Sequence, residues 1–162
     1  GKFMEAQMKY GSAGFHAERD VARELAASYW SERGLFNKLG DYSSAGGLKS
    51  ASVRLADKLM ARVVSATSSN LTYRRSINDE KTIPWKSVPL ETVFKLLSRP
   101  KLSVDERIIL VRFALNRGLA KDAKIQLDKV LLEAPKRKKE LAPLQKAVEA
   151  ALAGGVAAPK KD

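Results

Sequence analysis

His16 is the only histidine in the chain, and imidazole is the side chain best suited to proton transfer or metal binding near neutral pH. Glu18 and Asp20 follow it, but at the start of a predicted helix these carboxylates serve the cap and the helix dipole. The chain contains no His-x₃-His pair, no acidic loop and no cysteine, so neither a metal site nor a thiol nucleophile is expected. A serine–histidine–acid triad would need the same histidine, and no nucleophile-elbow sequence is present.

The remaining residues of catalytic type also lack a catalytic arrangement. Glycines between residues 40 and 47 precede Lys49 and Ser50, but the spacing of a phosphate-binding loop is absent. Asp79 and Glu80 are adjacent in a polar stretch, where nothing would separate the pKa values of an acid–base pair. We therefore predict a non-enzymatic protein with no catalytic residues, no metal and no cofactor.

Two basic groups have a composition suited to phosphate contacts. Tyr73 stands beside Arg74 and Arg75, with Trp85 at the far end of the same polar stretch, so stacking and charge are combined. The alternative is a solvated loop whose aromatic side chain is anchored on the body of the protein. The second group follows a predicted helix end, where cations also complement the dipole; it comprises Lys136, Arg137, Lys138 and Lys139.

The overall charge favours anionic partners. The chain carries 30 Lys and Arg against 18 Asp and Glu, a formal charge of +12. Such a balance suits nucleic acid, an acidic protein surface or an anionic membrane surface. No apolar run approaches the roughly 20 residues of a transmembrane helix. The sequence begins at Gly1 and leaves open the compartment and the earlier removal of a targeting segment.

Helical spacing dominates the first part of the chain. Apolar residues recur every three or four positions over 16–32, with Gly34 as a predicted stop, and again over 48–66. The second stripe consists of Leu48, Ala51, Leu55, Leu59 and Val63. Residues 67–87 are rich in Ser, Thr, Asn and charge, so we predict a polar loop or linker that separates an N-terminal helical region, 1–66, from a second domain.

The second domain, 88–153, also reads as helical, with a disordered tail over 154–162. We expect helices over 90–97, 104–116 and 120–133, and a last helix that contains Leu141 and Val148. The run over 107–115 is also compatible with a buried strand. The capping-box pattern of Ser103 and Glu106 favours the helix.

Residues 104–137 resemble a single tetratricopeptide repeat, a 34-residue helical hairpin. Leu110 occupies the large aliphatic position and Ala123 the small position where the two helices approach. Pro135 ends the second helix, and Gly118 falls in the turn. Arg107, Val111 and Ala114 depart from the family pattern. An ordinary antiparallel helical bundle explains the same spacing, so the predicted fold is all-α, with either arrangement in the C-terminal half.

The resemblance implies a protein-interaction module, an adaptor or an accessory subunit of a larger assembly. In this family the first helices commonly line the binding face, and a basic face would suit an acidic segment or a terminal carboxylate. The corresponding residues are Arg107, Arg112, Asn116 and Lys121. The alternative function is a basic nucleic-acid-binding component of a ribonucleoprotein or nucleoid-like assembly. It would use Arg74, Arg75, Lys136, Arg137, Lys138 and Lys139.

Overall fold

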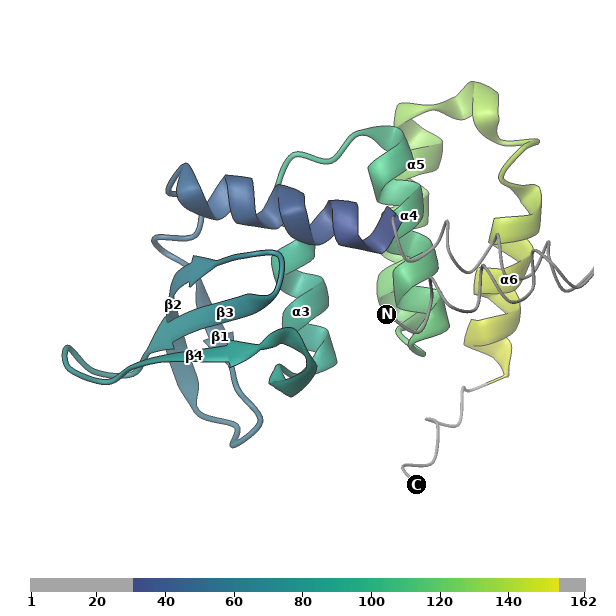
Figure 1. The fold of residues 1–162 in the computed structure, drawn as a ribbon. Coiled ribbons are helices and arrows are strands. Elements are labelled where there is room, and N and C mark those ends of the chain that lie inside the picture. The colour runs from purple at the N-terminus through teal and green to yellow at the C-terminus, as the bar shows by residue number, and fades with distance from the viewer. Residues whose placement is uncertain (1–30, 155–162) are drawn as a thin grey trace, which may run out of the picture.

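The structure is a computed structural model that describes residues 31–154. The predicted helix over 16–32, apart from its last two residues, lies outside this range, as do His16 and nearly all of the predicted tail. The chain runs through a helix over 31–44, a four-stranded sheet and then a group of helices (Figure 1). In Figure 1 the sheet lies at one end of the molecule, and α4, α5 and α6 stand together at the other.

The prediction of an all-α fold was wrong, because residues 52–84 form an antiparallel sheet with the order β1-β2-β3-β4. The strands are β1 (Ser52–Arg54), β2 (Met60–Ala66), β3 (Asn70–Arg74) and β4 (Glu80–Pro84). The expected helix over 48–66 is replaced by β1 and β2, and the expected loop over 67–87 contains β3, β4 and the short 3-10 helix η1 (Trp85–Ser87).

In residues 48–66 the apolar residues fit an alternation of period two, typical of strands, as well as the helical period. Val53, Ala61 and Val63 are buried, while their strand neighbours are exposed, as in a sheet with one covered face. Leu59, which the helical stripe required to be buried, is 56% exposed in the turn between β1 and β2. Lys58 adopts a left-handed φ of 65° in that turn, so the chain reverses where the helix was expected to continue.

The polar stretch forms strands because its few apolar residues alternate. Leu71 and Tyr73 are buried on β3, and polar residues on the same strand face outward. The β2–β3 turn is fixed by Thr67, whose hydroxyl oxygen accepts the Asn70 amide hydrogen at 3.0 Å. The edge strands of the sheet are β1 and β4, and the residues of β4 include the exposed Lys81 and Pro84.

The C-terminal half is helical as expected. It contains α3 (Leu90–Leu97), α4 (Val104–Asn116), α5 (Ala120–Glu133), the 3-10 helix η2 (Pro135–Arg137) and α6 (Ala142–Ala153). The helical prediction for 107–115 is confirmed, with the Ser103–Glu106 capping box in place. Gly118 adopts φ 76° in the α4–α5 turn, as the sequence predicted. Gly34 does not end a helix, because the helix over 31–44 runs through it.

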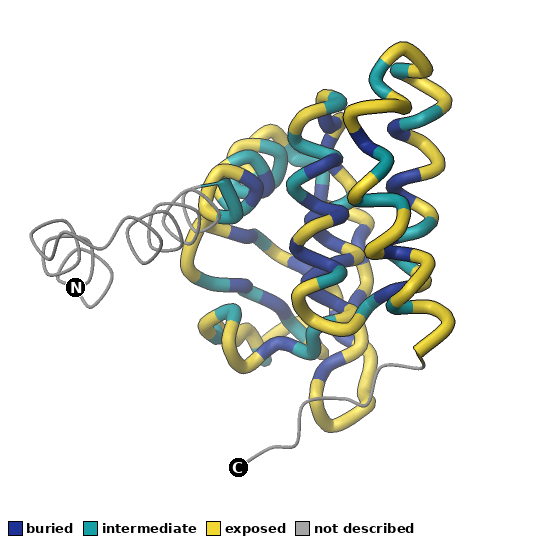
Figure 2. The backbone as a smooth tube through the Cα atoms, turned by 90° about the vertical axis from the view of Figure 1, so that its right-hand side faces the viewer, coloured by how far each residue is buried: buried dark blue, intermediate teal, exposed yellow. Residues whose placement is uncertain are grey.

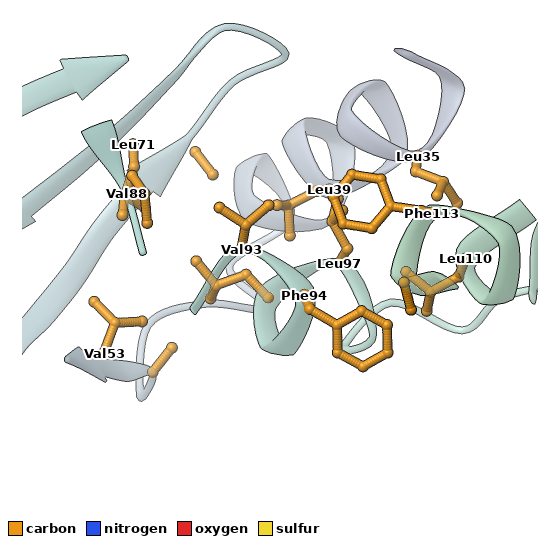
Figure 3. Packing of buried hydrophobic residues seen from close by; sticks show 14 of the residues in the cluster. Leu35, Leu39, Val53, Leu71, Val88, Val93, Phe94, Leu97, Leu110 and Phe113 are labelled. Carbon is orange, nitrogen blue, oxygen red and sulfur yellow. The ribbon is translucent and has the colours of Figure 1, made fainter. Parts of the chain in front are cut away.

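One apolar cluster connects the sheet with the helices. Figure 3 shows Val53 and Leu71 at the sheet, Leu39 and Leu97 in the middle, and Phe113 on α4. Figure 2 shows that the buried positions of the helices face inward and that the exposed positions lie on their outer sides. The helix over 31–44 therefore joins the sheet to the α4–α5 hairpin.

Candidate interaction surfaces

The described residues contain no group of three or more metal-binding side chains. Asp79, one of the two adjacent carboxylates, pairs with Lys81 at 3.3 Å in the exposed β3–β4 turn. Asp79 is thus held by an ion pair at the surface of the turn.

Arg107, one of the predicted partner-binding residues, lies between α4 and α5 instead of on an open face. Its side chain is only 15% exposed and donates hydrogen bonds to Gln126 at 3.3 Å and Glu133 at 3.1 Å. Its Nε–H is buried and has no hydrogen-bond partner among the described residues. Both Nη groups of Arg107 are thus engaged with α5, and only a small part of the side chain faces solvent.

The other predicted partner-binding residues are exposed. Arg112 and Asn116 lie one helical turn apart on α4, and Lys121 is in the first turn of α5. Lys121 lines a shallow hollow of about 300 Å³ between the α4–α5 turn and α6, together with Leu152. The structure therefore places these three side chains at the surface but separates them from Arg107.

The outward side of α5 carries exposed apolar residues that the sequence analysis did not select. Ile125 is 53% exposed and Leu132 is 83% exposed, while Ala123, Leu127 and Val130 on the opposite side are buried. The two exposed residues are seven positions apart, so they share one side of the helix at a separation of about 10 Å. We call the line formed by Lys121, Ile125, Asp128 and Leu132 the α5 ridge.

The two basic groups of the nucleic-acid alternative are partly neutralised. Arg75 pairs with Asp57, and its guanidinium lies 5.7 Å from the centre of the Tyr73 ring. Arg137 pairs with Asp105 at 2.5 Å and with Glu140 at 2.8 Å. Hydrogen bonds to Glu140 and then to Asp105 raise the pKa of Arg137, and the bond to Arg137 lowers the pKa of Glu140. Both arginines thus have structural roles.

The other members of these groups are available for contacts. Lys136, Lys138 and Lys139 are exposed around η2, and none has an ion-pair partner within the described range. Arg74 is half-buried on the outward face of β3, where it also lacks an ion-pair partner among residues 31–154. Of the two basic groups, three lysines and one arginine therefore have no ion-pair partner within residues 31–154.

Trp85 is not a loose loop residue. Its indole Nε1–H donates to the Thr67 carbonyl oxygen at 3.0 Å, and its ring packs against Phe36 with 5.2 Å between centroids. The two rings line an open groove of about 610 Å³ between the start of the described helix, the β2–β3 turn and η1. This contact agrees with the alternative interpretation of the sequence, in which an aromatic side chain of the polar stretch is anchored on the body of the protein.

No helix within the described range is both long and apolar enough to cross a membrane. Comparison with protein-family models, curated proteins and solved structures gives no match. The tetratricopeptide resemblance therefore stays a prediction. The residues that carry it include the helical hairpin of α4 and α5.

Proposed function

We propose that the protein is a non-enzymatic interaction module, an adaptor or an accessory subunit, that binds an acidic amphipathic helix of a protein partner. The observation that carries this proposal is the α5 ridge. Ile125 and Leu132 leave apolar area in water, and burying such area is the main source of favourable binding free energy. A helix partner with apolar residues two turns apart would match their spacing.

Charge around the ridge favours an acidic partner. Lys121 and Lys129 are exposed on α5, and Lys136 follows just beyond its end. Asp128 is already paired with Lys124 at 2.5 Å, so the one acidic member of the ridge is offset within the helix. The two cations on α5, with a third just beyond its end, would attract carboxylates at the rim of an interface and disfavour a basic partner.

The test uses a fluorescent peptide helix with leucines on one side and glutamates on the other. We expect saturable binding to the full chain, and loss of binding in the double variant Ile125→Ser and Leu132→Ser. Both side chains are exposed, so the variant should retain its fold. The matched control is Leu59→Ser with Ile77→Ser, because these residues are 56% and 89% exposed at the other end of the molecule.

Equal loss of binding in the two double variants would contradict the proposal, because it would show non-specific hydrophobic adsorption. Absence of peptide binding at physiological salt would also contradict it. Sedimentation of the chain alone tests whether the ridge instead binds a second copy, in which case the dimer should be lost in Ile125→Ser and Leu132→Ser.

A further inference from the structure

The outward face of the sheet carries a row of arginines that is separate from the α5 ridge. In the register, Ser52, Arg62 and Arg74 stand opposite one another on β1, β2 and β3. Arg54 lies two residues beyond Ser52 and therefore on the same face. The residues between them in the strands are buried, so all three arginine side chains lie on the opposite side of the sheet, which no helix within residues 31–154 covers.

This arrangement is electrostatically unfavourable by itself. Like charges directly opposite each other on a sheet repel, and Arg62 faces Arg74 directly. Glu80 stands opposite Arg74 on β4, yet within residues 31–154 no ion pair joins them and none involves Arg54 or Arg62. A bound anion would relieve this repulsion, so the row is suited to phosphate.

Arg62 is held in position before any ligand binds. Its Nε and Nη2 donate to the Lys49 carbonyl oxygen at 3.1 and 3.0 Å, so one edge of the guanidinium is fixed. This bond satisfies a backbone oxygen without neutralising the charge. A fixed cation loses less conformational entropy on binding than a freely rotating one.

The arginine row leads along β3 and β4 to the Trp85 groove. Next to it on the same face, the hydroxyl oxygens of Thr72 and Thr82 are 2.9 Å apart, and the following register pair is Asn70 with Pro84. Pro84 also lines the groove, together with Trp85 and Lys86. The outward sheet face therefore meets the groove at Pro84, while the Trp85 ring lies on the helix side of the sheet against Phe36. A ligand that contacts both must be flexible enough to pass around the end of β4.

The length of this surface indicates what kind of ligand could contact all of it. Arg74 and Asn70 are four residues apart on one strand, which corresponds to about 13 Å. A single phosphate cannot span this distance, whereas a polymer with regularly spaced phosphates can. Trp85 provides a ring for stacking, which requires a base that is not already paired and stacked in a duplex.

We infer that the outward sheet face and the Trp85 groove together bind single-stranded nucleic acid. Arg54, Arg62 and Arg74 contact the phosphates, and an unstacked base lies against Trp85. Within the Thr72–Thr82 pair, the hydroxyl that accepts from the other donates a further hydrogen bond to the nucleic-acid backbone. This surface does not include the α5 ridge, so nucleic-acid binding can be tested independently of the proposed protein-binding function.

The test is fluorescence anisotropy of a labelled oligouridine and a matching DNA duplex with the full chain, titrated from low to physiological salt. The variant is Arg54→Gln with Arg74→Gln, because neither side chain has an ion-pair partner within 31–154. The control is Lys138→Gln with Lys139→Gln, which removes the same charge at η2. We expect the arginine variant to weaken binding about tenfold and to lower the salt slope by about 1.4, or 0.7 per lost phosphate contact.

A second readout reports the groove directly. In a chain carrying Trp30→Phe, only Trp85 remains to emit, because the sequence has two tryptophans. Oligouridine should quench this emission in proportion to binding. The inference is overturned if the two double variants weaken binding equally, if Trp85 emission does not respond, or if the duplex binds as tightly as the single strand. It is also overturned if anionic phospholipid vesicles bind at physiological salt and the oligonucleotide does not.

Discussion

Glu106 shows how one residue serves two structural contacts. Its carboxylate accepts the Ser103 amide hydrogen at 2.7 Å in the capping box of α4, and it pairs with Lys38 of the helix over 31–44 at 2.5 Å. Partial burial opposes its charged form, but the contacts with Lys38 and Ser103 outweigh burial and lower the pKa of Glu106 below its ordinary value of 4.5. The sequence predicted the cap, but nothing local predicted the contact with a residue 68 positions away.

The lowered pKa makes a pH-dependent contribution to stability. The stabilisation from ionised Glu106 is fully present above the ordinary value of 4.5 and is lost as the pH falls through the lower folded-state pKa. We expect Glu106→Gln to destabilise the protein at neutral pH and to lose less stability than the wild type on acidification. Urea unfolding from pH 7 to pH 3 measures the difference between the two chains. A constant difference across that range would contradict the assignment.

At the scale of the element, the two glycines Gly34 and Gly118 should respond to alanine in opposite directions. Gly34 lies inside the helix over 31–44, and a Cβ placed there has no heavy atom within 4 Å. Gly34→Ala should therefore stabilise the protein by about 1 kcal/mol, the difference in helix propensity.

Gly118 occupies the left-handed region at φ 76° and allows the chain to turn from α4 into α5. Gly118→Ala should destabilise by about 1 kcal/mol, because a Cβ is strained in that conformation. Chemical denaturation of both variants tests the pair together, and effects of the same sign would contradict the structural assignment of one of them.

These elements also show what the sequence could and could not predict. The helices of the C-terminal half were predicted correctly because caps, turns and apolar spacing agree there. Over 48–66 the stripe of Leu55, Leu59 and Val63 fits a helix, while Val53, Ala61 and Val63 fit strands. The tertiary contacts decided in favour of strands: the inward strand residues reach the apolar cluster shared with Leu39 and Leu97.

The surfaces were harder to predict than the elements. Arg74 and Trp85 were selected for composition, but Arg54 and Arg62 were assigned to a helix, so their alignment with Arg74 could not be anticipated. That alignment depends on strand register, which is set by non-local pairing. Similarly, Arg107 fits a binding position in the resembled family, whereas its exposure depends on Gln126 and Glu133 across the hairpin.

The whole molecule should unfold as one unit, because the apolar cluster spans both ends. Leu39 is fully buried at the middle of this cluster (Figure 3). We expect Leu39→Ala to lower the free energy of unfolding by about 2–5 kcal/mol, through lost burial and the cavity left behind. Trp85 fluorescence, in the Trp30→Phe chain, reports the sheet end, and far-UV circular dichroism reports the helices. The two transitions should shift together, and a shift in only one would show two separate units.

The edge strand β4 also affects how copies of the chain behave toward one another. An uncovered edge strand can recruit a strand from another molecule and begin ordered aggregation. Here β4 contains Pro84, which has no amide hydrogen to donate, and the charged residues Glu80 and Lys81, which would lose water if another strand paired with this edge. This edge should therefore resist fibril formation even when the protein is concentrated, for example within an assembly that gathers many copies.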